Sequence, residues 1–437
     1  MKVLNRYLLK ELTTPFFTTF FVLFFVLLSQ FILKNLDRFL GKGLSLGLIL
    51  KFLFLNSAWI ISLAFPMAIL VTTLITFGKL SSNNEITAFK ASGIAYNTLL
   101  KPCLAFSIFI FIILIPYNLW ILPEMNHNVR KLSLKISKNR PDIEFNENML
   151  NILSDKTIYL GDRINSNSFS NVIIFDNKYN NSHNTIMADE GEFISMHDGI
   201  RLKLNEGSIH ENSTNNHEYK KTYFDSYQIS IPFDELGFND THNLTKQERE
   251  MNIYQLIEQN KYFKTRTIVE NKKLVQNNNS LTKLTDSLTN SSFSKEGNIL
   301  ASSKLKNKIN ILKKKIEKNN RLIPIFNKES NKYGVEIHKK FSVPFACIIF
   351  VLLGMPLGIL AKKSNMGISV SISLGIFIVY WCFLILGEGL ADKTIITPTI
   401  AMWSPNLFLG LISYYLYSLV NKENITFKIN LLNFFKK

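Results

Sequence analysis

The sequence predicts an α+β membrane protein with three membrane spans, a large hydrophilic domain and three further spans. Between the third and fourth spans, residues 124–340 are mostly hydrophilic and contain short runs of alternating apolar residues. About 20 apolar residues suffice to cross a hydrocarbon core of ~30 Å. Six stretches of at least 21 residues contain no Asp, Glu, Lys or Arg: 12–33, 52–78, 102–123, 341–361, 364–387 and 394–421.

The charges of the short loops predict how the spans are oriented. With the N-terminus inside, the inner segments carry 12 Lys or Arg residues and the outer short loops carry five. The positive-inside rule favours this arrangement, and a long loop contributes little to it. We therefore expect both termini in the cytoplasm and the large domain outside. The first apolar run is too long for a cleaved signal peptide.

The outer block divides by charge. Residues 124–245 carry 12 basic and 18 acidic side chains, whereas residues 246–340 carry 21 basic and 9 acidic ones. In the first part, turn residues separate short runs that predict strands at a spacing typical of a sandwich or a jelly roll. The pattern alone does not distinguish these two folds. The runs are Thr157–Leu160, Asn171–Phe175, Gly191–Ile194, Ile200–Leu204 and Tyr227–Ile231.

The second part of the block predicts helices. Apolar residues step by four, three and four along one coiled-coil seam, at Leu305, Ile309, Leu312 and Ile316. The segment Asn277–Asn298 is rich in Asn, Ser and Thr and predicts a loose connection. This basic region is either a solvated helical hairpin or a surface that engages anionic lipid or a partner.

Several kinds of chemistry find no support in the sequence. It contains no G-x-x-x-x-G-K-[ST] motif, so it cannot bind ATP through a P-loop. Cys103, Cys347 and Cys382 all fall in predicted spans, which leaves the outer domain without a disulfide framework. No paired Cys/His spacing suggests a metal site. We expect no catalytic residue, no cofactor and no nucleic-acid partner.

A short polar helix is predicted at 81–97, between the second and third spans. Ser82 and Glu85 match the S-x-x-E capping box, and Ile86, Phe89 and Gly93 share one face at helical spacing. A chain that only crosses a bilayer needs no such element. A permease that couples to a cytoplasmic ATPase does.

Other motifs follow along the chain. They are Leu202-x-Leu204-x-x-Gly207 followed by Phe224, Met251–Ile257, His338–Ala346, Gly354-Met355-Pro356-Leu357-Gly358 and Trp403-Ser404-Pro405-Asn406. With the 81–97 segment, they make the chain resemble the LptF/LptG family of lipopolysaccharide-export ABC permeases. The resemblance covers all six spans and the first part of the outer domain. The segment from about 260 to 330 is longer than the family's usual link to the fourth span.

The resemblance implies a domain order and a location. Residues 1–123 would hold spans one to three, 124–245 a periplasmic β-jellyroll, 246–340 a basic helical connection, and 341–437 spans four to six with a cytoplasmic tail. The chain would lie in the inner membrane of a Gram-negative bacterium.

The resemblance also implies partners. These are an LptB-like cytoplasmic ATPase dimer that hydrolyses the ATP, a paralogous permease subunit, LptC- and LptA-like jellyroll bridge proteins, and lipopolysaccharide as cargo. Glu85, Ile86, Phe89 and Gly93 would dock into the ATPase.

Three cations mark the outer end of the first span. Lys34, Arg38 and Lys42 are spaced at i, i+4 and i+8, so a continued helix would place them on one face. The positive-inside rule disfavours cations there. They either snorkel to lipid headgroups or bind lipid phosphate, with which ammonium and guanidinium groups pair strongly. The resemblance favours the second reading, because the family uses basic residues here to hold lipid A phosphates.

One strand suggests how a lipid would pass the outer domain. Ile200, Leu202 and Leu204 alternate with Arg201 and Lys203, which places the apolar residues on one face. That face either lines a path for acyl chains or packs as a closed interior.

Two other functions remain open from the sequence. One is a mechanotransmitting ABC permease for lipoprotein or another lipid, although such permeases usually have four spans. The other is a membrane receptor or scaffold, which would need no coupling helix.

Overall fold

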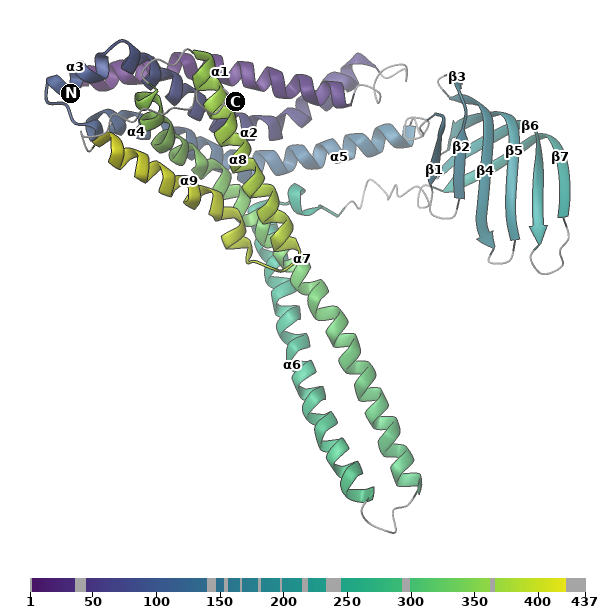
Figure 1. Cartoon of the computed structure of the whole chain (residues 1–437). Helices are drawn as coiled ribbons and strands as arrows, with labels where there is room; N and C mark the ends of the chain where they lie inside the picture. Colours follow the sequence, from purple (N-terminus) through teal and green to yellow (C-terminus); the bar gives the residue numbers. More distant parts are fainter. Residues whose placement is uncertain are drawn as a thin grey trace, which may run out of the picture. The chain divides into compact units, whose positions relative to one another are not determined.

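A computed structural model describes residues 2–35, 45–139, 147–152, 156–165, 167–179, 182–196, 199–213, 219–232, 245–292, 299–361 and 366–421. The chain forms two compact units (Figure 1). The first, the helical unit, comprises Met1–Val26, Trp59–Glu124 and Gln247–Lys437. The second, the sheet unit, comprises Leu27–Ala58 and Met125–Lys246.

Each predicted span lies largely within a helical segment, and α7 and the α4–α5 segment extend well beyond the spans predicted for them. Their bounds are α1 Lys2–Lys34, α2 Leu46–Ser82, α3 Glu85–Ala91, α4 Tyr96–Pro116, α5 Leu122–Asn139, α6 Ile253–Ser292, α7 Ile299–Leu360, α8 Met366–Asp392 and α9 Pro398–Asn421. A π-helical turn, Tyr117–Ile121, joins α4 to α5, and a 3-10 turn, Glu248–Glu250, precedes α6.

Five helical segments in the described part of the chain are long and apolar enough to cross a membrane. They are Lys2–Lys34, Leu46–Ser82, Tyr96–Ile136, Lys304–Leu360 and Gly367–Asp392. The sixth predicted span forms α9, a helix of 24 residues. At about 1.5 Å per residue it is long enough to span, but it carries Asn406, Tyr414, Tyr415 and Tyr417 and is less apolar. The sixth span therefore stays a prediction.

The core of the helical unit is continuous. Buried residues of α1, α2, α3, α4, α7, α8 and α9 belong to one apolar cluster. Tyr380 of α8 packs edge-on against Phe350 of α7, with ring centroids 5.2 Å apart, and both side chains are fully buried. Trp403 of α9 contacts Phe345 of α7. Helix α7 is thus the element against which α8 and α9 both pack.

Two glycines let α2 and α7 approach closely. A Cβ on Gly354 would lie 3.0 Å from the Thr73 Cβ, and one on Gly358 would lie 2.8 Å from the Phe77 Cβ. Because the glycines are four residues apart, they present one small-residue face, the G-x-x-x-G arrangement that permits tight helix crossing in membranes. The Gly354–Gly358 motif thus has a packing role.

Helices α6 and α7 form an antiparallel hairpin (Figure 1). The predicted seam is confirmed, because Ile309 is buried and Leu305, Leu312 and Ile316 are half-buried. Phe263 of α6 stacks on Tyr333 of α7, and the Asn319 side-chain amide donates to the Glu270 carbonyl over 3.3 Å. Such polar contacts fix the register of paired helices.

The prediction of a loose connection over Asn277–Asn298 is wrong for most of its length. Helix α6 continues to Ser292. Asn, Ser and Thr compete with the helical backbone for hydrogen bonds and so weaken a helix. Here apolar residues such as Leu274, Leu281 and Leu284 recur in a heptad along the face toward α7, and this pairing outweighs local propensity.

The sheet unit contains one antiparallel sheet. Its strands are β1 Met149–Ile152, β2 Lys156–Leu160, β3 Arg163–Asn165, β4 Ser168–Tyr179, β5 Ser182–Ser195, β6 Gly199–Ser213 and β7 Tyr219–Pro232. They are ordered β1-β2-β4-β5-β6-β7, and β3 also pairs with β4. All five predicted runs lie in strands, but β4 to β7 are much longer than predicted. The described strands form one continuous antiparallel sheet. They do not divide into the two sheets of a sandwich.

Side chains on one face of this sheet are buried by other side chains of the same sheet. Its cluster contains only sheet residues, among them Ile158, Phe169, Phe193 and Leu202. Phe169 and Phe193 meet edge-on at 5.6 Å and are nearly inaccessible. An isolated flat sheet would expose one whole face, so we infer that the long strands curl around this interior.

Gly207 explains the motif that ends in Phe224. The two residues are directly opposed in the β6–β7 pairing. A Cβ on Gly207 would lie 2.6 Å from the tip of the Phe224 ring and 2.2 Å from the Met187 carbonyl oxygen. Glu206 beside it has φ 49°. Only glycine permits this close backbone approach.

The first testable prediction concerns the α2–α7 crossing. We expect Gly358→Leu to destabilise the protein by about 1–3 kcal/mol, because the side chain would overpack a filled interface. Thermal unfolding of the purified full chain measures this. Gly375→Leu on α8 is the matched control, since nothing lies within 4 Å of a Cβ there. Equal melting temperatures for the two variants would contradict the assigned packing role.

Candidate functional site

Helix α3 begins differently from the predicted capping box. Helix α2 continues to Ser82, whose hydroxyl donates back to the Lys79 carbonyl over 3.0 Å. The N-cap of α3 is Asn84, with φ 60° and no side-chain capping bond. The capping-box prediction is therefore wrong. Asparagine tolerates the left-handed conformation better than most residues, so the chain turns at Asn83–Asn84 instead.

The end of α3 is a Schellman motif. The Gly93 N–H donates to the Lys90 carbonyl over 2.9 Å, and the Ile94 N–H donates to the Phe89 carbonyl over 2.9 Å. Gly93 has φ 77°. Glycine adopts this conformation at no steric cost, which makes it the usual residue at this position. The small-residue ending of the predicted helix thus serves to reverse the chain into α4.

The two faces of α3 differ. Ile86 is buried in the core of the helical unit, and Phe89 is half-buried against that core. Thr87, Ala88 and Ala91 are exposed. Of the apolar residues predicted to dock a partner, Ile86 therefore anchors α3 to its own bundle, and the accessible surface consists of short side chains.

Glu85 already has partners within the chain. Its Oε2 accepts a hydrogen bond from the Tyr7 hydroxyl over 2.7 Å, and its Oε1 accepts one from the Asn83 amide over 3.3 Å. Because Tyr7 belongs to α1, this carboxylate links α3 to the first helix. No local sequence pattern predicts this long-range pair.

Further polar contacts hold this end of the bundle, which we call the α3 end. Lys79 forms an ion pair with Glu11 at 2.9 Å, and the Thr76 hydroxyl donates to the Glu11 carbonyl over 3.1 Å. The buried Ser81 hydroxyl donates to the Ile359 carbonyl over 2.9 Å. These bonds join α1 and α7 to the last turns of α2, directly before α3.

The predicted phosphate-binding residues are described only in part. Lys34 is the last residue of α1 and is exposed. Arg38 and Lys42 lie outside the described residues.

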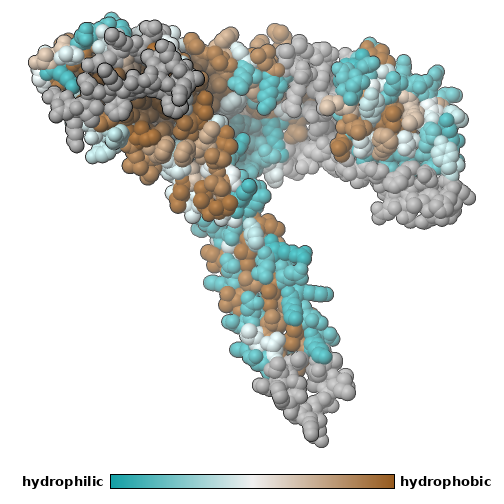
Figure 2. All heavy atoms as spheres, in the orientation of Figure 1, coloured by the Kyte–Doolittle hydropathy of each residue, from teal (hydrophilic) through white to brown (hydrophobic). Residues whose placement is uncertain are grey.

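Helix α1 exposes much of its apolar surface. Phe17, Phe21 and Phe25 are 56%, 62% and 70% exposed. Figure 2 shows hydrophobic residues gathered over the helices, whereas the α6–α7 hairpin mixes them with hydrophilic ones. Exposed apolar area of this extent marks contact with lipid or another protein.

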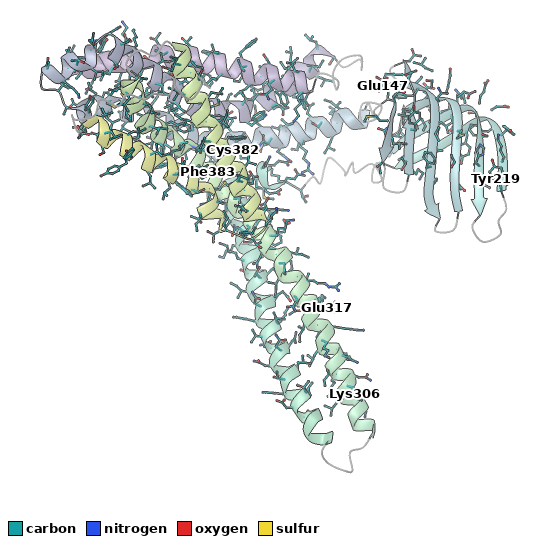
Figure 3. The ribbon with its side chains drawn as sticks, in the orientation of Figure 1. Glu147, Tyr219, Lys306, Glu317, Cys382 and Phe383 are labelled. Atoms are coloured by element: carbon teal, nitrogen blue, oxygen red, sulfur yellow. The ribbon has the colours of Figure 1, made fainter. Side chains whose placement is uncertain are left out.

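The predicted lipid path lies in the sheet interior. Ile200, Leu202 and Leu204 are at most 1% exposed and belong to the interior cluster. A Cβ on Gly191 would lie 2.7 Å from Val172. The interior is filled by side chains, so a lipid could enter only if the curled sheet opened. Figure 3 shows this unit's side chains, with Tyr219 labelled on β7.

The opposite end of the helical unit, called the α6 end, holds a buried cation that was not singled out from the sequence. The Lys340 ammonium donates to the Asn118 carbonyl over 3.0 Å, and the Ser62 hydroxyl donates to Asn118 Oδ1 over 2.7 Å. Asn118 lies in the π-helical turn, where the regular α-helical bonding is interrupted. Such turns recur at functional sites. A lysine directly preceding an apolar run was the available signal.

Four charged side chains form a ring beside this cation. Arg249 lies 2.9 Å from Glu388 and 3.4 Å from Glu336, and Lys339 lies 2.8 Å and 3.5 Å from the same carboxylates. Burial alone would lower the pKa of Arg249, but the two carboxylates outweigh it and raise that pKa. The ring fastens the 3-10 turn before α6 to α7 and α8.

The described residues contain no group of three or more His, Cys, Asp or Glu side chains that could hold a metal ion.

Comparison of the sequence with known proteins points to one family. The sequence profile of the family described as "Lipopolysaccharide export system permease LptF/LptG" matches residues 6–419. The chain is 21% identical over 248 residues to the lipopolysaccharide export system permease protein LptF of Escherichia coli K12, covering 55% of this chain and 68% of that protein. The LptF proteins of Escherichia coli O157:H7 and Shigella flexneri match equally. The chain therefore belongs to the LptF/LptG family of lipopolysaccharide export permeases.

Proposed function

We propose that this chain is one permease subunit of an ATP-driven transporter that extracts lipopolysaccharide from the inner membrane and passes it to a periplasmic bridge. The observation that carries the proposal is the family match over residues 6–419. The order of elements along the chain supports it, because apolar helices both precede and follow an antiparallel sheet. ATP hydrolysis takes place on a separate LptB-like dimer. A paralogous permease subunit pairs with this chain, and the two subunits together enclose the cavity that receives the lipid.

The α3 end faces the cytoplasm in this proposal. The exposed Thr87, Ala88 and Ala91 form a surface of short side chains onto which a groove of the ATPase can close. The contacts of Glu85 with Tyr7 and of Ser81 with Ile359 link that surface to α1 and α7. Movement of the ATPase would thus reach three helices at once. A receptor or scaffold would have no use for this element.

The exposed phenylalanines of α1 supply a wall for acyl chains. Phe17, Phe21 and Phe25 lie on the same helix as Lys34. Acyl chains along this wall would place a phosphorylated headgroup near the end of α1. There Lys34, with Arg38 and Lys42, would pair with its phosphates. LptC- and LptA-like bridge proteins would then receive the lipid from the sheet.

The second testable prediction concerns Glu85. We expect Glu85→Gln to reduce lipid-stimulated ATP hydrolysis several-fold, because the charge that meets the ATPase is lost while the side chain keeps its shape. Stimulated hydrolysis by the reconstituted complex measures the effect. Tyr7→Phe is the companion variant: it removes only the internal partner and should leave complex assembly intact. Normal assembly and normal stimulation in Glu85→Gln would rule out electrostatic coupling.

The third prediction concerns the outer cations. Replacing Lys34 and Arg38 together by Glu should abolish most of the stimulation of hydrolysis by lipopolysaccharide while basal hydrolysis persists, since reversed charges repel phosphate. Lys51→Glu is the control, because Lys51, near the start of α2, is also exposed and falls among the five cations of the predicted outer short loops. An unchanged stimulation, or an equal loss in the control, would favour snorkelling instead.

The fourth prediction concerns the sheet interior. A photo-crosslinker at Leu202 or Leu204 should capture lipopolysaccharide only during ATP hydrolysis, because the packed interior has to open to admit acyl chains. A crosslinker at the exposed Lys220 serves as the control. Capture that does not depend on ATP, or no capture at either interior position, would make the sheet a packed scaffold.

A further inference from the structure

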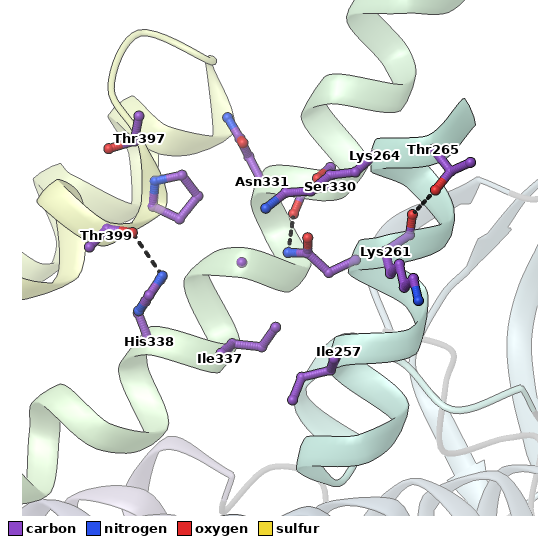
Figure 4. A pocket seen from close by; sticks show the side chains of 13 residues that line it. Ile257, Lys261, Lys264, Thr265, Ser330, Asn331, Ile337, His338, Thr397 and Thr399 are labelled. Atoms are coloured by element: carbon purple, nitrogen blue, oxygen red, sulfur yellow. Dashed lines mark hydrogen bonds between the residues drawn. The ribbon is translucent and has the colours of Figure 1, made fainter. Parts of the chain in front are cut away.

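A pocket of about 680 Å³ lies at the α6 end, where the α6–α7 hairpin meets the first turn of α9 (Figure 4). Its cationic or titratable lining residues are Lys261 and Lys264 of α6 and His338 of α7. Thr397, Pro398 and Thr399, at the start of α9, form the opposite wall. The pocket belongs entirely to the helical unit, and Lys34 is not among its lining residues.

The walls of the pocket are fixed by packing. A Cβ on Gly334 would lie 2.9 Å from the Pro398 ring, so the glycine lets α9 begin directly against α7. The buried Asn260 amide donates to the Ser330 carbonyl over 3.1 Å and ties α6 to α7. Thr399 and His338 are hydrogen-bonded at 2.9 Å across the α7–α9 gap. Contacts within the chain therefore hold the walls of the cavity.

The charge of the pocket is unbalanced. No Asp or Glu is among its lining residues, and within the described chain neither Lys261 nor Lys264 has a carboxylate within 4.0 Å. Like charges three residues apart on a helix repel one another. In Figure 4 the Lys264 side chain reaches from α6 toward α7, which concentrates positive charge over the cavity.

The acidic residues at this level are engaged elsewhere. Glu336 and Glu388 belong to the ring with Arg249 and Lys339. A second pocket is lined by that ring together with Glu248 and Asp392. Helix α7 thus separates a charge-paired pocket from a cationic one, and an external anion would balance the charge of the cationic pocket.

Backbone donors complete the pocket. Ala401 is the first residue of α9 whose N–H bonds back within the chain, to the Thr397 carbonyl at 3.0 Å. The preceding N–H groups, of Thr399 and Ile400, belong to a first turn that has no intrahelical carbonyl to bind. The N-terminus of this 24-residue helix also carries a partial positive charge. Ammonium groups and helix N-terminal amides together favour phosphate.

We propose that this pocket binds the phosphate group of an anionic headgroup. Its volume exceeds that of a phosphate alone and leaves room for the attached sugar or glycerol, against which Ile257 and Ile337 provide apolar wall. His338 precedes the apolar run 341–361 by three residues, which puts the pocket at headgroup level. The site does not depend on the proposed transport role, because a membrane phospholipid would satisfy it as well as the cargo.

The fifth prediction tests this site on the purified full chain in detergent. The probe is fluorescent phosphatidylglycerol followed by anisotropy, with phosphatidylcholine and inorganic pyrophosphate as competitors. Lys261→Gln with Lys264→Gln should raise the Kd about tenfold, since two charge-assisted contacts are lost. Lys261→Arg with Lys264→Arg should restore binding. Circular dichroism checks that each variant is folded.

The matched control is Lys313→Gln with Lys314→Gln, two exposed lysines of α7 that lie outside the pocket and lose the same charge. Their binding should be unchanged. Displacement by pyrophosphate would identify phosphate itself as the ligand, and resistance to it would assign a lipid headgroup. An equal loss in the control, or no loss in the pocket variant, would overturn the proposal. The assay contains no ATPase, so its failure leaves the transport proposal standing.

Discussion

The close contact between α2 and α7 is the constraint on which the helical unit depends. Glycines at 354 and 358 let the backbones approach until a single methyl group would clash. Within lipid there is little hydrophobic force between helices, so such packing supplies much of their association. Because α7 is one helix of 62 residues, this contact also positions the other contacts that α7 makes along its length. At the C-terminal end of α7 these include the Ser81–Ile359 bond beside α3, and farther back along the helix they include the Lys340 contact and the charged ring.

This arrangement connects α3 to several helices of the bundle. The short helix has few contacts of its own, but Ile86 enters the core and Glu85 bonds to α1. A force on α3 therefore acts on α1 and α2 directly, and through α2 on α7. The glycine contact leaves little room for α2 and α7 to slide, since interfaces of this density do not deform gradually. Under the proposed function, a displacement of α3 would therefore be transmitted as a rigid movement of the α2–α7 pair relative to α1, whose exposed phenylalanines form the proposed lipid wall.

The sequence predicted the elements that local patterns determine. It did not predict features that depend on contacts with other parts of the chain. Runs without charge located five helical segments that are apolar enough to span, and alternation located parts of five described strands, because burial imposes both patterns. The capping box at Ser82 failed since α2 continues to that residue. Asn277–Ser292 was misjudged because pairing with the following helix α7 stabilises it, and local helix propensity does not register such pairing. For the site, the position of Glu85 was predictable, but its bond to Tyr7 joins residues 78 positions apart and leaves no local trace. Lys261 and Lys264 likewise become a site only once α9 is placed opposite them.

The filled interior of the sheet has an energetic consequence for any lipid that passes through it. Fully burying an Ile or Leu side chain contributes about 1.5–3 kcal/mol, so separating Ile200, Leu202 and Leu204 from their neighbours is costly in water. An acyl chain offers the same apolar contacts that the side chains lose, and it would offset most of that cost. The sheet should therefore remain closed when empty and open only as lipid replaces its own interior contacts. A conduit of this kind would need no separate gate. Apolar contacts among the side chains keep it closed, and the acyl chain replaces those same contacts when it enters.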